Sequence, residues 1–194
     1  MVRNGYKLLL ILLVAIGFSF VAKTDIWYTR SAKVTFFSST PIEDIKANNN
    51  QVTFAFNQVT GDVSVKIAIK SFKFKKKLMQ EHFNENYMES DKFPYAQYKG
   101  KINDIGKIDF ATDTSGNFIK PTTYNVTTKG KMTIHGVTRD VVTTGKIILK
   151  GKQATIKTNF DVLLVDYNIE KPTIMAMKIA DKIEVTIESV CKNK

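Results

Sequence analysis

The stretch VTFAFNQVTGDVSVKIAIK (residues 52–70) decides the fold of this chain. Apolar residues alternate with small or polar ones up to Phe56, and after the Thr60-Gly61 turn the alternation resumes at Val63. A period of two puts apolar side chains on one face of a strand, and a turn between two such runs is typical of a β-hairpin. The stretch therefore predicts two antiparallel strands that share one apolar face.

The apolar positions change parity beyond this hairpin. The alternation passes from Ile69 to Phe72 and Phe74, with lysines between the phenylalanines. A shift of one residue turns a whole face of a strand over. We therefore expect a β-bulge near Lys70 and Ser71 that keeps both halves facing one interior.

Alternating apolar and polar residues recur along the rest of the chain. The apolar members include Val126, Met132, Ile134, Val141, Ile147, Leu149, Ile156, Phe160, Val162, Ile183, Val185 and Ile187. One apolar and one polar face per strand, repeated about every ten residues, indicate an antiparallel barrel or sandwich. The sequence thus predicts an all-β fold of about eight strands.

One segment, KLMQEHFNENYMES (residues 77–90), breaks this pattern. Leu78, Met79, Phe83 and Tyr87 fall on one side at helical spacing, and the segment contains no Gly or Pro. It predicts one amphipathic helix, which needs an apolar surface to lie on. We expect that surface to be the mouth or one edge of a barrel.

The first residues are predicted to be a signal peptide. A short positive segment, Met1 to Lys7, precedes the uncharged run Leu8 to Ala22. This layout is typical of secretory signals, whereas a spanning helix needs about 20 apolar residues. Residues 1–22 are therefore expected to direct residues 23–194 to the periplasm or out of the cell, with an uncut membrane anchor as the alternative.

The composition fits one folded domain. The chain has 194 residues, of which 43% are hydrophobic and 24% charged, enough for a single core. Its one cysteine, Cys191, excludes an internal disulfide framework and a cysteine-based zinc site. The net charge is +11, or +9 once Arg3 and Lys7 leave with the leader. This surplus favours anionic partners and a transient contact with a membrane surface.

Neither nucleic acid binding nor catalysis is expected. Base stacking requires outward aromatic side chains, and the phenylalanines here share the inward parity. The two histidines, His82 and His135, belong to no H-E-x-x-H motif, and no G-x-S-x-G elbow is present. The sequence therefore predicts a protein that is not an enzyme, with no catalytic residue, no metal and no cofactor.

Several motifs together resemble the YceI-like family. They are LMQEHFNENYMESDKFPYAQYKG (78–100), IDF (108–110), IHGVTR (134–139) and DYNI (166–169), which precedes Pro172. The resemblance extends in order over residues 31–189. It implies a lipocalin-like, eight-stranded antiparallel barrel around an elongated tunnel, a polyisoprenoid lipid as ligand, export from the cytoplasm and a tendency to form homodimers.

The inward side chains are the candidate ligand-binding residues. In the barrel these are Phe54, Phe56, Val65, Ile67, Phe72, Phe74, Tyr124, Met132, Phe160 and Val162. From the helix, Met79, Phe83 and Tyr87 are expected to close one side, and His135 and Arg139 to form a polar rim. Each buried CH₂ group contributes about 0.8 kcal/mol, so apolar walls alone can retain a long chain.

Two functions remain open at this stage. The first is an exported, non-enzymatic carrier that holds an isoprenoid-like lipid, or another elongated apolar lipid, inside the barrel. The alternative is a protein-interaction or stress-response module whose barrel is filled with side chains and carries no lipid. An eight-stranded barrel is wide enough for either arrangement.

Overall fold

The computed structural model describes residues 25–171 and 179–193, so the predicted signal peptide lies outside the described residues. The strands are β1 (Ile26–Ser39), β2 (Asp44–Asn57), β3 (Asp62–Ala68), β4 (Lys73–Phe74), β5 (Tyr95–Ile102), β6 (Thr122–Ile134), β7 (Val137–Lys150), β8 (Gln153–Leu163) and β9 (Lys182–Asn193). The helical turns are η1 (Ile69–Ser71), α1 (Lys77–His82), η2 (Phe83–Tyr87), η3 (Ile105–Lys107) and η4 (Leu164–Tyr167).

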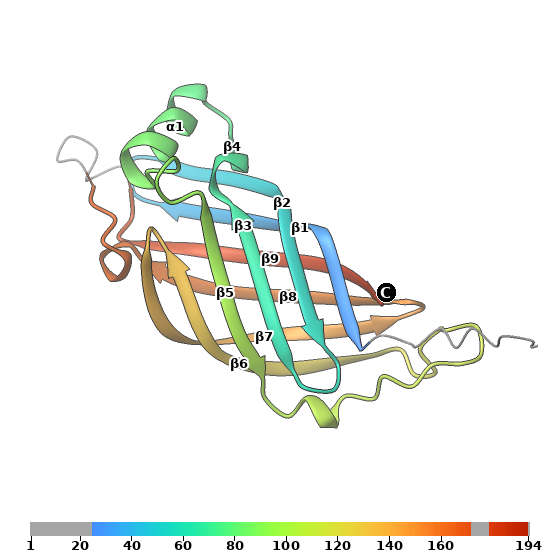
Figure 1. Cartoon of the computed structure of the whole chain (residues 1–194). Helices are drawn as coiled ribbons and strands as arrows, with labels where there is room; N and C mark the ends of the chain where they lie inside the picture. The colour runs from blue at the N-terminus through green and yellow to red at the C-terminus, as the bar shows by residue number, and fades with distance from the viewer. Residues whose placement is uncertain (1–24, 172–178, 194) are drawn as a thin grey trace, which may run out of the picture.

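The strands form one closed antiparallel barrel. Their order is β1-β9-β8-β7-β6-β5-β3-β2, and β2 pairs back onto β1, which closes a ring of eight strands (Figure 1). The two-residue strand β4 adds to β2 where β3 no longer accompanies it. The all-β fold of about eight strands predicted from the alternation is therefore confirmed, as is the lipocalin-like barrel that the family resemblance implies.

The parity change lies where the sequence predicts it, but its form differs. The 3₁₀ turn η1, rather than a bulge, separates β3 from β4. The facing strand β2 adjusts as well, because Asn49 and Val52 are both buried although their positions differ in parity. The Asn49 side chain donates to the Ala68 carbonyl (2.7 Å) and accepts from the Gln51 amide (2.8 Å). This buried amide satisfies the backbone groups that the interrupted ladders release.

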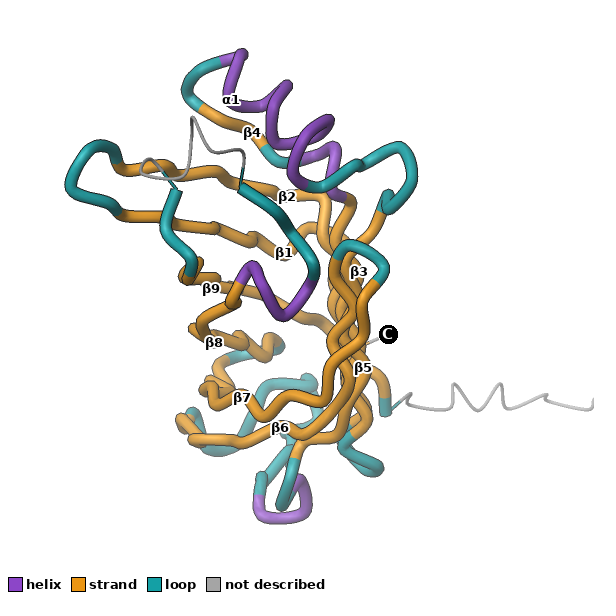
Figure 2. The backbone as a smooth tube through the Cα atoms, turned by 90° about the vertical axis from the view of Figure 1, so that its left-hand side faces the viewer, coloured by secondary structure: helices purple, strands orange, loops and turns teal. Residues whose placement is uncertain are grey.

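The amphipathic helix is shorter than expected. The α-helical part, α1, ends at His82, and the next turn, η2, is π-helical, with the Met88 amide bonded to the Phe83 carbonyl at 2.9 Å. Together they cover residues 77–87 and lie over one end of the barrel (Figures 1 and 2). Within the described residues, none of the helices combines the length and apolar character that a membrane crossing requires.

Aromatic side chains plug the opposite end of the barrel, which holds the start of β1 and the loop between β5 and β6 (Figure 1). Trp27 stacks on Phe56 at 6.3 Å between ring centroids, and on Phe118 from the β5–β6 loop at 5.3 Å. Phe110 of the same loop also stacks on Trp27. The indole N–H donates to Gln58 Oε1 at 2.8 Å, which satisfies its only polar group.

Cys191 is buried beside Ser189, and burial raises the pKa of its thiol to about 11. Since the thiolate is the nucleophile, iodoacetamide at about pH 8 should alkylate it about 100-fold more slowly than a thiol of pKa 9.0. The rate should then increase as the pH is raised toward 11. Mass spectrometry of labelled protein measures this, with the urea-unfolded chain as control. Equal rates in native and unfolded protein would contradict the buried position.

Candidate functional site

The barrel encloses a cavity of about 350 Å³ between its middle and the end that carries α1. Side chains from all described strands except β7, from α1 and from the turns η1, η2 and η4 line it, and nearly all of them are apolar. Small-molecule pockets commonly occupy about 300–1,000 Å³ and are lined in the same way. The interior therefore has room for a ligand of modest size or for part of a longer chain.

Most of the predicted lining residues border this cavity. From the strands they are Val65, Ile67, Phe74, Met132, Phe160 and Val162, and Phe72 follows the turn η1. From the helical segment they are Met79, Phe83 and Tyr87. Further apolar wall residues that were not proposed include Val34, Phe36, Ile69, Tyr98, Ile134, Ile183, Val185 and Ile187. For the last three, the signal was already present in the alternation of the final strand.

Phenylalanines attach the helix to the barrel. The Phe83 ring lies 5.0 Å from that of Phe74, 5.4 Å from Phe72 and 5.6 Å from Phe36, measured between centroids. The apolar side of the helix therefore packs on the cavity wall formed by Phe36, Phe72 and Phe74. Phe83 is one of the residues that the helical spacing singled out. Together with Met79 and Tyr87, it makes α1 and η2 part of the cavity wall.

A smaller cavity of about 60 Å³ lies next to the large one. Val65, Tyr98, Met132, Phe160 and Ile187 border both, so they form the partition between them. Phe54 lines only the smaller cavity.

Hydroxyl groups meet at this partition. The Tyr98 hydroxyl lies 2.6 Å from Thr128 Oγ1, which in turn lies 2.9 Å from Thr143 Oγ1. Burial raises the pKa of Tyr98 above its ordinary value, and the hydrogen bond with Thr128 lowers it by less. The phenol is therefore neutral at physiological pH, and the partition carries hydroxyls without charge.

Two of the predicted lining residues lie elsewhere. Phe56 belongs to the aromatic plug with Trp27, and it borders neither cavity. Tyr124 also borders neither, and its hydroxyl accepts a hydrogen bond from the Asp109 amide at 3.2 Å. Both share the inward parity, but they face the part of the interior that side chains fill.

The two residues predicted for a polar rim do not border either cavity. His135 Nε2 lies 2.8 Å from Glu89 Oε2 and its Nδ1 lies 3.2 Å from the Tyr167 carbonyl. Arg139 Nε donates to the Asp166 carbonyl at 2.8 Å. Both side chains therefore hold the segment around η4 against the β6–β7 hairpin.

The β6–β7 turn explains why glycine follows this histidine. His135 and Gly136 both have positive φ, 50° and 76°, as a two-residue type I′ hairpin requires. A Cβ at Gly136 would also lie 2.5 Å from the Phe93 ring, which packs on the His135 ring at 4.7 Å between centroids. The His-Gly pair is therefore needed by the turn and its packing.

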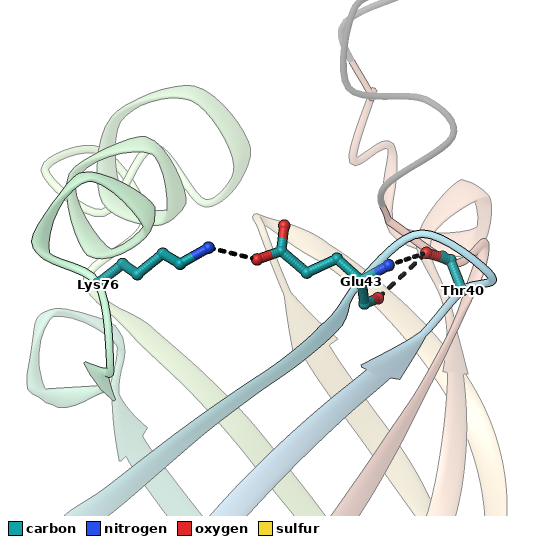
Figure 3. Close-up of polar contacts among 3 residues, drawn as sticks. All are labelled: Thr40, Glu43 and Lys76. Atoms are coloured by element: carbon teal, nitrogen blue, oxygen red, sulfur yellow. Dashed lines mark hydrogen bonds and ion pairs between the residues drawn. The ribbon is translucent and has the colours of Figure 1, made fainter.

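An ion pair spans the helix end of the large cavity. Lys76 Nζ, just before α1, lies 2.6 Å from Glu43 Oε1 in the β1–β2 turn, and both residues border the cavity (Figure 3). Thr40 holds this turn, because its hydroxyl donates to the Glu43 carbonyl (3.1 Å) and accepts from the Glu43 amide (3.2 Å). The pair is partly solvated, so its effect on stability is small.

Charged groups are confined to that end of the cavity. Among the described lining residues, the ionisable side chains apart from tyrosines are Glu43, Lys76 and His82. No group of three or more His, Cys, Asp or Glu residues within the described ranges could hold a metal ion. The walls thus favour an uncharged, apolar guest.

Comparison with known proteins agrees with this architecture. A family model described as a YceI-like domain matches residues 28–191. A search of curated proteins found no significant match.

Several solved structures share the fold. A polyisoprenoid binding domain from Saccharophagus degradans, implicated in plant cell wall breakdown, has a TM-score of 0.71 at 12% identity and covers 89% of this chain and 100% of its own. BcnA from Burkholderia cenocepacia has a TM-score of 0.64 at 15% identity, with 84% and 96% covered. A Campylobacter jejuni YCEI protein has a TM-score of 0.58 at 19% identity, with 80% and 89% covered.

Proposed function

The chain belongs to the family of the YceI-like domain, and from this premise we propose that it is a non-enzymatic binding protein for an isoprenoid-like lipid. The apolar chain of the ligand would occupy the cavity of about 350 Å³, and its polar end would lie at the end that carries α1. Export to the periplasm or the cell exterior, a transient contact with a membrane and assembly into homodimers belong to the same proposal.

The observation that carries the proposal is the apolar cavity of about 350 Å³, which extends from the middle of the barrel to the end that carries α1. Protein interiors are normally filled to the density of organic crystals, and an empty apolar cavity costs stability. The wall combines eight of the nine described strands with the helix, so the cavity is a feature of the whole barrel rather than of one loop. An apolar guest would recover the lost contacts, at about 0.8 kcal/mol per buried CH₂.

The fold relatives support the choice of lipid. The Saccharophagus degradans domain is described as binding polyisoprenoids, and its fold covers most of this chain. The alternative function, an interaction module, was tied to a filled barrel, and the cavity counts against that premise. The proposal also takes the protein to be a binding protein rather than an enzyme, as the polyisoprenoid-binding fold relative suggests.

Lipid extraction together with native mass spectrometry tests the proposal. Protein isolated from its own host should carry an added mass that organic solvent removes, and the extract should contain an isoprenoid chain. Delipidated protein should gain thermal stability when geranylgeraniol is added, because a ligand that binds only the folded state raises the melting temperature. A matched saturated fatty alcohol serves as the control for chain chemistry. Lack of co-purified lipid together with no thermal response to any of these chains would refute a carrier function.

A further inference from the structure

The barrel wall is incomplete between β7 and β8. These strands pair only from Gly145↔Thr158 to Lys150↔Gln153, near the plugged end. Toward the α1 end, Val137–Thr144 pairs with β6 alone and Asn159–Leu163 with β9 alone. Figures 1 and 2 show the two strands diverging over this length. In the part of the chain that the structure describes, no backbone ladder bridges this opening.

The point where the strands part is built into the sequence. Beyond the last ladder pair, the Thr158 hydroxyl donates to the Thr144 carbonyl at 2.6 Å. Gly145 permits the close approach of the strands at this point, since a Cβ there would lie 2.8 Å from the Lys157 carbonyl oxygen. A side-chain hydrogen bond thus takes over where the backbone ladder stops.

The other end of the opening is also fixed. The turn η4 follows β8 directly, and two side chains of the β6–β7 hairpin region hold its backbone. Arg139 binds the Asp166 carbonyl and His135 contacts the Tyr167 carbonyl. The unpaired stretch between β7 and β8, which we call the slit, is therefore bounded by Thr158 at one end and by η4 at the other.

The small cavity reaches both edges of this slit, whereas the large cavity reaches only its β8 edge. The small cavity is lined by Thr143 and Gly145 from β7 and by Thr158 and Phe160 from β8. The large cavity is lined by Phe160 and two further residues on the same side, Val162 and Leu164. A chain that occupies the interior would therefore lie directly behind the slit.

Exposed apolar residues surround the slit on the outside. Val142 on β7 is 63% exposed, Leu163 at the end of β8 is 42% exposed, and Val165 in η4 is 75% exposed. Exposed apolar side chains on the elements that bound this slit point to contact with an apolar phase.

A basic face adjoins this apolar rim. On the outer surface of β5 and β6, Lys99 lies opposite Lys131 and Lys101 opposite Lys129, and the latter lies opposite Val142 of β7. Lys131 pairs with Asp140, whereas the other three lysines have no ion pair within the described residues. Like charges directly across a ladder are destabilising, and β5 and β6 are each paired on both sides, so these lysines protect no sheet edge. The arrangement complements a field of negative charges such as an anionic bilayer surface.

We propose that the slit between β7 and β8 is a lateral portal, at which the protein docks on an anionic bilayer and through which the apolar chain passes between bilayer and barrel. This inference rests on the proposed function and specifies its route. The lysines of β5 and β6 would meet the head groups, while Val142, Leu163 and Val165 would reach the acyl region.

Transfer of tritiated geranylgeraniol from phosphatidylglycerol-containing vesicles tests the portal. The variant carries Val142→Asp, Leu163→Asp and Val165→Asp. Its matched control carries Val59→Asp, Ile119→Asp and Val190→Asp, whose native side chains are 63%, 59% and 48% exposed and lie outside the rim. All six side chains are exposed, so both proteins should fold. Because charge opposes insertion of the rim into the acyl region, we expect the rim variant to take up the chain about tenfold more slowly than the control.

The equilibrium retention of chain already loaded from detergent should be the same in both variants. Equal uptake rates for rim variant and control would overturn the portal. If neither protein, nor the native one, retains the chain after loading from detergent, the proposed function itself fails.

A covalent staple provides a second measurement. Cysteines at Val142→Cys and Leu163→Cys, joined by a flexible bismaleimide, should block uptake from vesicles while preloaded chain stays inside. Reduction of a cleavable version of the linker should restore uptake, and Cys191 is buried and so should not react. Uptake that is unchanged by the staple would show that the chain enters elsewhere, for example at the end under α1, and would overturn the portal.

Discussion

Ile67→Trp is expected to abolish retention of an isoprenoid chain while leaving the barrel folded. Ile67 lies on β3, is only partly buried and borders the large cavity. A larger side chain there can extend into existing space rather than into neighbouring atoms. It would take the room of about four chain carbons, which at about 0.8 kcal/mol each corresponds to roughly a hundredfold loss of affinity.

The control for this variant is the same residue placed in a filled region. Leu149 is fully buried and borders neither cavity, so Leu149→Trp should cost about 1–3 kcal/mol of stability through overpacking. Any chain binding that survives in this variant should be close to native. Comparison of Ile67→Trp with Leu149→Trp thus distinguishes a loss of binding space from a loss of stability.

Chemical denaturation and geranylgeraniol titration measure the two effects. If Ile67→Trp destabilises the barrel as much as Leu149→Trp does, the space beside Ile67 is not available to a ligand. If it binds the chain with native affinity, the cavity is not the binding site.

Trp27→Ala should cause a large loss of stability, about 3–5 kcal/mol, as expected for removal of a buried aromatic side chain. Trp27 is 3% exposed and stacks on Phe56, Phe110 and Phe118, so its removal leaves a void that these rings cannot close without moving. It also leaves the Gln58 side chain without its indole donor. The loop between β5 and β6 would lose its main attachment to the barrel.

Trp27→Phe is the matched variant, since it keeps an aromatic ring but loses the N–H group and part of the stacking area. The loss of unfolding free energy in Trp27→Phe should be clearly smaller than in Trp27→Ala. Urea unfolding followed by far-UV circular dichroism measures the stability of both variants. Tryptophan fluorescence cannot be used, because both variants lack the only tryptophan of the chain. A cost below about 1 kcal/mol for Trp27→Ala would mean that the plug does not hold this end together.

The alternation of apolar residues predicted the barrel well because it is a local signal. In β3, β6, β8 and β9, and in β2 from Val52 onward, inward residues repeat every second position, and burial of one face enforces that repeat. The helix was located for the same reason, from the spacing of Phe83 and Tyr87. The end of the α-helical part was not predicted. The next turn, η2, has π-type hydrogen bonds, and the spacing of apolar residues does not distinguish these from α-helical ones.

Other features depend on partners far away in the sequence and could not be predicted. Asn49 is one of several asparagines in a polar run, and only its contact with Ala68 on the neighbouring strand β3 gives it a buried role. Trp27 precedes the part of the chain where the alternation was recognised, so the plug was missed. His135 and Arg139 were expected at a ligand rim, whereas their contacts with Tyr167 and Asp166 attach η4.

The sequence by itself determined which side chains face inward, since strand periodicity and apolar burial are properties of short segments. It did not determine which of those side chains meet one another and which face empty space. Phe56 and Phe74 have the same character and the same orientation, yet one belongs to a packed plug and the other borders a cavity. That difference depends on how far opposite walls lie apart, which is set by ladder lengths such as the one that ends at Gly145 and Thr158. Only the assembled barrel fixes those distances.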